Sequence, residues 1–309
     1  MGPIGDILSS DLLRRALFEA MIVGALGGVI GVHLVLRRLS FTAMALTHAT
    51  FPGVVLAAII GANLLLGSAV FGVVVVALLW LVSRRTDLNA STATGVILAG
   101  GFASGVLLLS AQDGFSRDLT SFLVGSVLTV STSDVVVTAL AAIAIVGILM
   151  LLHGPLVFSG FDRIGAESAG LGVAAIDLGL LLLIEIALVV SIPTVGIILS
   201  VSLLVAPAAT SRLWVDRIGA SMVLAAGLGA LAGAIGILIS HTAGTAAGAT
   251  IAVVAGAVFA ISLVASPHHG LFAHRQPHAT TPTTRSTTPT PAAAVAQRPV
   301  AQESERGGG

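Results

Sequence analysis

One stretch decides the fold class: residues 62–82 read ANLLLGSAVFGVVVVALLWLV and contain no charged side chain. A helix needs about 20 apolar residues to cross a hydrocarbon core of about 30 Å. Similar stretches follow one another from Ala16 to about Ala265, and they are too long and too weakly alternating for barrel strands. The sequence therefore predicts an all-α, polytopic bundle of transmembrane helices.

The span count stays open between eight and nine. The candidate spans cover residues 16–36, 39–60, 62–82, 91–111, 134–152, 174–192, 194–213, 218–240 and 245–265. We expect three parts: an N-terminal segment 1–15, a transmembrane domain 16–265, and a disordered tail 266–309 rich in Pro, Thr and Ala, which cannot bury a core.

The orientation follows from the arginines. The connections after the odd spans carry nearly all the arginines between spans, whereas the connections after the even spans carry only Arg117. The positive-inside rule places the arginine-rich connections in the cytoplasm of a multi-pass plasma membrane protein. Arg14 and Arg15 conflict with this assignment, because nine spans would put them outside the cell. The cytoplasmic set comprises Arg37, Arg38, Arg84, Arg85, Arg163, Arg212 and Arg217.

The composition excludes several classes of function. The 309 residues have a mean hydropathy of +1.07, 14 cationic and 14 acidic side chains, no cysteine and no lysine. The balanced charge gives no support for nucleic-acid binding. Without lysine there is no Walker-A or Schiff-base lysine, so ATP hydrolysis would need a partner chain. The His-Glu-x-x-His motif of metalloproteases is also absent, so we expect no enzymatic activity and no cofactor in this chain.

The second span contains a candidate metal-binding pair. Met44 and His48 are four residues apart, so their side chains share one face of a helix. Thioether and imidazole groups both bind transition metals, although a hydrogen bond from His48 to a neighbouring helix is the alternative. Pro52 lies one turn later and is expected to kink the helix beside His48.

Two further spans contain unusual residues. Glu185 lies in the middle of the sixth span, where a carboxylate needs a partner; a cation path and a structural ion pair both explain it. Pro207 lies within the seventh span among small residues. Two interpretations remain open: a kink that helps helices to pack, and a part of the transport pathway.

The long connection 153–173 is predicted to be cytoplasmic. It contains a short polar segment that ends in glycine, as expected of an element that docks a soluble partner.

The order and spacing of several motifs resemble the permease subunits of zinc/manganese-type ABC importers. The resemblance covers about residues 15–265. The matching motifs are Leu39-Ser-Phe with His48-Ala and Pro52-Gly53, Asp118-Leu119 with Gly125, Asp134, Phe161-Asp162 with Ala166 and Gly170-Leu171, Val195-Gly196 with Pro207-Ala-Ala-Thr, and Ser240 with Gly248-Ala-Thr-Ile251.

The resemblance implies a homodimer of permeases, cytoplasmic ATP-binding subunits, and an extracellular metal-binding lipoprotein or periplasmic protein that delivers Mn²⁺ or Zn²⁺. His48 matches the pathway histidine of the family, whereas Met44 stands where the family usually has Asp. The exchange of a hard for a soft ligand weakens the case for Mn²⁺ and favours Zn²⁺, Cu⁺ or a non-metal cargo. The alternative is that Met44 only packs and that the path uses His48, backbone carbonyls and water. His241 is a candidate entry ligand.

The resemblance also assigns coupling to the ATPase to Asp162, Ala166 and Gly170. Two alternatives remain open. One is an ion-coupled secondary transporter in which Glu19, Asp177 and Glu185 titrate. The other is an ABC permease with a non-metal cargo.

Overall fold

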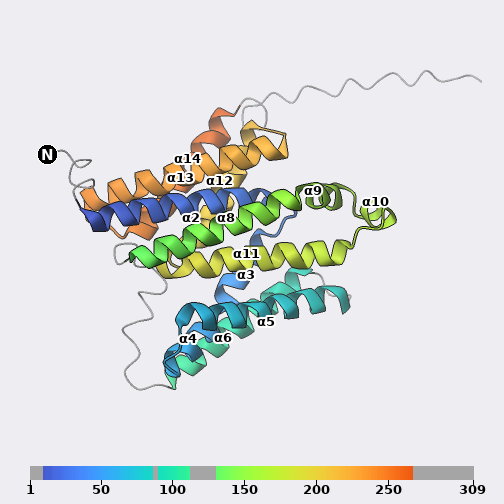
Figure 1. Ribbon diagram of the computed structural model, residues 1–309, viewed down its shortest axis with the longest axis horizontal. Helices are drawn as coiled ribbons and strands as arrows, with labels where there is room; N and C mark the ends of the chain where they lie inside the picture. Colours follow the sequence, from blue (N-terminus) through green and yellow to red (C-terminus); the bar gives the residue numbers. More distant parts are fainter. Residues whose placement is uncertain (1–9, 86–89, 112–129, 267–309) are drawn as a thin grey trace, which may run out of the picture. The chain divides into compact units, whose positions relative to one another are not determined.

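The computed structural model describes residues 10–85, 90–111 and 130–266, and the elements in these ranges are helices (Figure 1). Eight spans in this part of the chain are long and apolar enough to cross a membrane, which confirms the predicted polytopic all-α class. The predicted motif Asp118 to Gly125 and the tail from residue 267 lie outside the described residues.

The helices follow the predicted spans closely. They are α2 (Asp11–Leu36), α3 (Ser40–Ala49), α4 (Phe51–Ile59), α5 (Leu64–Arg85), α6 (Ala90–Ser110), α8 (Thr132–Leu151), α9 (His153–Phe161), α10 (Arg163–Ser168), α11 (Val173–Val195), α12 (Ile197–Trp214), α13 (Ile218–Ala243) and α14 (Ala247–Ala265). Together α3 and α4 form the second span.

Close helix packing around α2 depends on glycine. Carbons added at Gly24 and Gly28 would collide with the backbone of Gly229 and Ala225 on α13. Because the numbers rise along α2 while they fall along α13, the two helices are antiparallel. Gly31 approaches the backbone of α12 in the same way. Small residues let membrane helices come together at this distance, so α2, α12 and α13 form a tightly packed unit.

The second span is interrupted between α3 and α4. Thr50 separates the two helices, and Pro52 is the second residue of α4. Because proline has no N–H, the carbonyl of His48 loses its usual helical donor four residues later. The Thr50 hydroxyl donates to the carbonyl of Leu46 at 3.0 Å, which also accepts from the Thr50 amide at 3.1 Å.

The α3 helix contacts α5 and α6 as well as α11 and α12. In Figure 1 it lies between α11 and the group formed by α4, α5 and α6. Its buried residues Ala43, Leu46 and Ala49 belong to the largest apolar cluster. The α3 helix is therefore packed against other helices on more than one side.

Candidate functional site

The interrupted span positions the predicted metal-binding pair. His48 lies one residue before the end of α3, and its imidazole is half-buried. The ring meets Phe102 of α6 edge-on, with 5.7 Å between the ring centroids. The imidazole thus lies beside the helix break, where the carbonyl of His48 itself lacks its usual donor.

Met44 contacts a different part of the bundle. Its side chain is 39% exposed and lines a groove of about 490 Å³. Phe41 of α3 and Phe259 of α14 contribute to the same groove, and the remaining lining residues come mostly from α12. Met44 and His48 share a helix, but Met44 faces this open groove while His48 packs against α6.

Glu185 is buried in α11 and points at α5. A carbon added at Gly72 would collide with the Glu185 carboxylate, so the absence of a side chain at Gly72 makes room for it. Neither carboxylate oxygen has a hydrogen-bond partner in the part of the chain that the structure describes. An ionised carboxylate in this position is costly unless a proton or a cation accompanies it.

The structure separates the other candidate ligand from these residues. His241 is exposed in the last turn of α13. Because α13 is antiparallel to α2, His241 lies at the end where α2 begins, opposite Arg37. Within residues 10–85, 90–111 and 130–266, no group of three or more His, Cys, Asp or Glu side chains could hold a metal ion. The candidate ligands therefore do not form one closed site within a single copy.

Pro207 is buried within α12, and the helix continues from Ile197 to Trp214 without a break. The two prolines therefore differ: Pro52 stands at a helix interruption and Pro207 within a continuous helix.

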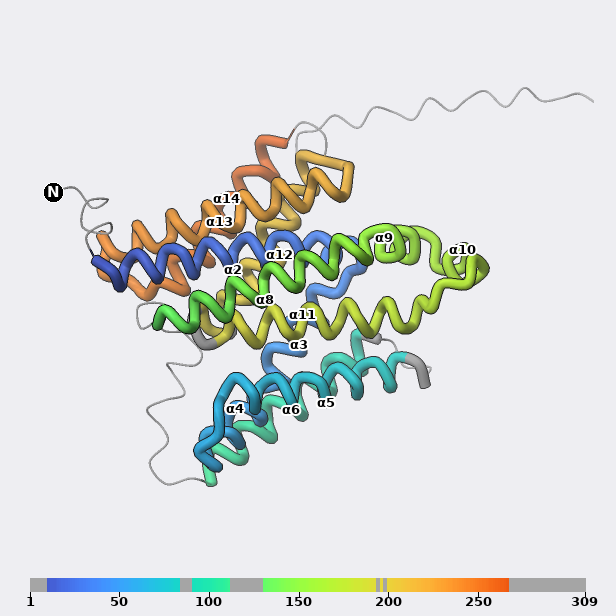
Figure 2. The backbone as a smooth tube through the Cα atoms, viewed as in Figure 1, coloured from blue at the N-terminus to red at the C-terminus, as the bar shows by residue number. Residues whose placement is uncertain are grey.

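The connection from α8 to α11 contains two short helices at one end of the bundle, as Figure 2 shows for α9 and α10. Asp162 caps α10 by accepting a 2.8 Å hydrogen bond from the Gly165 amide. Ala166 is fully buried, and Gly170 has a positive φ of 81°, which favours glycine. These residues set the shape of the connection.

Two large apolar side chains of this connection are strongly exposed. Phe161 is 72% exposed and Ile164 is 79% exposed. A large apolar side chain in an aqueous connection is costly to leave uncovered, so the two residues form an exposed apolar pair suited to contact with another protein. Phe161 had been matched only as part of the Phe161-Asp162 motif, and Ile164 lay outside the residues matched.

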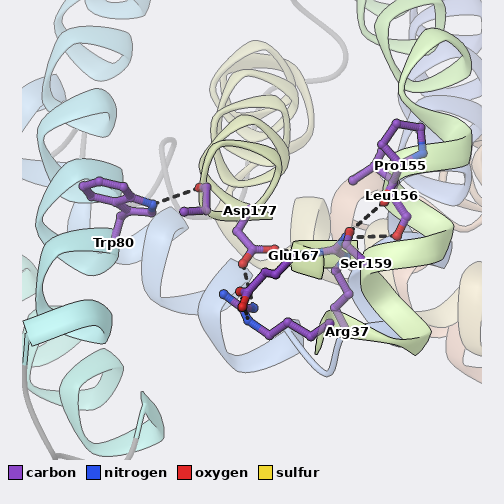
Figure 3. Close-up of polar contacts among 9 residues, drawn as sticks. Arg37, Trp80, Pro155, Leu156, Ser159, Glu167 and Asp177 are labelled. Atoms are coloured by element: carbon purple, nitrogen blue, oxygen red, sulfur yellow. Dashed lines mark hydrogen bonds and ion pairs between the residues drawn. The ribbon is translucent and has the colours of Figure 1, made fainter. Parts of the chain in front are cut away.

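A polar network joins this connection to the end of α2 (Figure 3). Arg37, the residue after α2, donates hydrogen bonds to the carboxylate of Asp177, to the Leu156 carbonyl at 3.0 Å and to the Ser159 hydroxyl at 2.7 Å. Arg163 of α10 donates to the other carboxylate oxygen of Asp177 at 2.8 Å. The sequence identified Arg37 only as an indicator of orientation.

With this geometry established, comparison with known proteins defines the class. Residues 9–266 match the ABC 3 transport family, and the chain belongs to that family. It is a multi-pass plasma membrane protein and the transport component of an ABC transporter.

Individual relatives cover nearly the whole chain. The manganese transport system membrane protein MntC of Halalkalibacterium halodurans is 35% identical over 86% of this chain and 91% of its own length. The zinc transport system membrane protein TroC of Treponema pallidum is 30% identical over 86% of this chain and 92% of its own. A solved structure of PsaBC from Streptococcus pneumoniae in complex with Fab matches with a TM-score of 0.78 and 29% identity, over 86% of this chain and 95% of that chain.

Proposed function

We propose that this chain is the membrane permease of an ABC transporter that imports a divalent transition metal, manganese or zinc. The observation that carries the proposal is similarity, over 86% of the chain, to permeases named for manganese and for zinc transport. The interrupted second span adds a physical argument, since it places a half-buried imidazole beside a carbonyl without its helical donor. Nitrogen and oxygen ligands of this kind suit both metals.

The metal path runs along α3 in this proposal. His48 and its backbone carbonyl provide transient ligands beside the break at Pro52. Met44 provides a soft ligand in the groove, and His241 receives the ion at the opposite, extracellular end. Glu185 supplies negative charge within the bundle. A path that releases its ion should bind it weakly, so the lack of a closed cluster among the described residues fits transport better than storage.

A second copy of the chain covers the groove beside α3. The groove is apolar and exposes Phe41 and Met44, which makes it suited to contact with an identical permease. Met44 would then lie at the interface between the copies. Ligands from the partner copy could complete a path that one copy leaves incomplete.

ATP is hydrolysed on a separate cytoplasmic subunit, since this chain contains no lysine for a Walker-A motif. The end of the bundle that carries Arg37 faces the cytoplasm. Phe161 and Ile164, which we call the docking surface, insert into the ATPase subunit there. An extracellular metal-binding lipoprotein or periplasmic protein delivers the ion at the other end, where His241 lies.

Metal uptake in cells that lack this chain tests the proposal. Cells complemented with the wild type should regain uptake of Mn²⁺ or Zn²⁺, and His48→Ala should not restore it. His153→Ala is the matched control, because it removes another half-buried imidazole from outside α3 and should restore uptake. Restoration of uptake by His48→Ala would remove His48 from the path.

A second arm of this experiment separates the proposal from its alternatives. Deletion of the ATPase subunit should abolish uptake, whereas a secondary transporter would continue to work without that subunit. If wild-type complementation corrects no metal defect, the cargo is not a transition metal.

A further inference from the structure

The position of Arg37 connects two regions that the proposed function treats separately. Arg37 directly follows α2, and α3, which carries His48, begins only three residues later at Ser40. At 1.5 Å per residue, His48 lies about 12 Å along α3 from its start. The guanidinium group meanwhile holds α9 and α11. One side chain thus lies between the docking surface and the start of the helix that carries His48.

The contacts of Arg37 leave the guanidinium little freedom. Only 11% of the side chain is exposed, and its two terminal nitrogens donate three hydrogen bonds. The Ser159 hydroxyl that accepts one of them itself donates to the Pro155 carbonyl at 2.7 Å. A planar guanidinium that bonds two helices at once fixes their relative positions better than a single point charge would.

Asp177 extends this connection to α10. One carboxylate oxygen accepts from Arg37 and the other from Arg163, so a single carboxylate bridges arginines from two segments. Displacement of α10 therefore pulls on Asp177, and through Asp177 on Arg37.

The turn between α2 and α3 is stiff enough to transmit such a displacement. The amide of Leu39 donates to the carbonyl of Leu34 at 2.9 Å, and the amide of Arg38 donates to the carbonyl of Val35 at 3.1 Å. Arg38 has a positive φ of 58°, which is typical of the residue that ends a helix with this pair of hydrogen bonds. Since Arg37 belongs to this hydrogen-bonded turn, its movement turns the start of α3.

The network also has room to rearrange. A cavity of about 550 Å³ borders it and is lined by Arg37, Arg38, Trp80, Arg163 and Asp177 among others. Arg163 is 59% exposed and also pairs with Glu167 at 3.5 Å, so it has a second acid available within its own helix. An element with two available arrangements is what coupling between distant sites requires.

From this arrangement we propose that Arg37 is a positioning residue that couples the docking surface on α9 and α10 to α3. When the ATPase subunit moves α10, the connection through Asp177 and Arg37 shifts the start of α3 and changes the surroundings of His48. The inference rests on the proposed function, because it assumes that ATP hydrolysis drives transport along α3. It adds a residue outside the motifs to which the resemblance assigns coupling.

The test measures metal transported per ATP hydrolysed, with the permease and its ATPase subunit reconstituted in proteoliposomes. Arg37→Gln should lower this ratio roughly tenfold, a size typical of a lost coupling contact. The ATPase subunit should still co-purify with the variant, and ATP hydrolysis should continue. Arg37→Lys should give an intermediate ratio, because it keeps the charge next to Asp177 and loses the second set of hydrogen bonds.

A second variant keeps the test decisive if the loss of Arg37 impairs folding. Arg163→Gln removes a largely exposed side chain from the other side of Asp177 and should also lower the ratio. Arg217→Gln is the control: it removes an exposed cation directly before α13, whose side chain has no hydrogen bond or ion pair with any described residue, and the ratio should stay at the wild-type value.

Two results would overturn the proposal. One is an unchanged ratio in both Arg37→Gln and Arg163→Gln. The other is a parallel fall of uptake and ATP hydrolysis with loss of the ATPase subunit, which would make Arg37 an anchor of the fold only. Failure of the proposed function looks different, because the wild type itself would then transport no Mn²⁺ or Zn²⁺ in the same vesicles.

Discussion

The exposed apolar pair on α9 and α10 gives a quantitative prediction for ATPase docking, namely the binding free energy that is lost when Ile164 is truncated. Ile164 is 79% exposed, so nearly its whole side chain is available for burial by a partner. Ile164→Ala removes three carbon atoms, each worth about 0.8 kcal/mol when buried. Allowing for the part that is already covered, the loss is about 2 kcal/mol, or about 30-fold in Kd.

The measurement is a binding titration of the purified ATPase subunit against the permease in lipid nanodiscs. Val253→Ala is the matched control, because Val253 is an exposed apolar residue on α14, far along the chain from the docking surface. It should leave the Kd unchanged. Since Ile164 is exposed in the free chain, the substitution should not alter the thermal stability of the permease alone.

A Kd within about twofold of wild type for Ile164→Ala would refute this reasoning, because it would mean that the ATPase subunit does not bury the Ile164 side chain. The same value for Phe161→Ala would exclude the whole docking surface. In that case the ATPase subunit would have to bind elsewhere on the arginine-rich end of the bundle.

Two further predictions concern the path and the packing. Met44→Asp should shift the preference of the transporter from Zn²⁺ toward the harder Mn²⁺, because it replaces a thioether by a carboxylate. Competition between the two ions in uptake assays measures this preference. An unchanged preference would assign Met44 to packing alone. Gly28→Ala should destabilise the solubilised protein by about 1–3 kcal/mol, because α2 and α13 must move apart, and a lowered Tm would report this. Gly227→Ala is its control, since open space surrounds that glycine, and equal Tm values for the two variants would contradict the packing.

Much of the fold could be predicted because a membrane helix is a local feature. The span 218–240 was predicted from apolar length alone, and α13 runs from Ile218 to Ala243. The break near His48 was likewise expected from Pro52, since a missing N–H acts within one turn. A proline does not always interrupt a helix, however, because α12 continues through Pro207 without a break.

The candidate site was less predictable. Asp177 lies near the start of the predicted span 174–192, but the sequence could not indicate that it bridges Arg37 and Arg163, which belong to segments far apart in the chain. The family resemblance assigned coupling to Asp162 and Ala166, and this role stays a prediction. The structure adds that Asp162 caps a helix and that Ala166 is buried. Exposure depends on how neighbouring helices pack, so Ile164 could not be distinguished from them beforehand.

The sequence by itself determined the class of the protein, the positions of its spans and its family, because each depends on local composition or on the order of motifs. Only the tertiary structure decided which residues of those motifs are exposed, buried or paired. The physical reason is that apolar character specifies that a helix lies in the membrane but not which face meets which neighbour. Steric fit at glycines such as Gly28, and hydrogen bonds such as those of Arg37, make that choice.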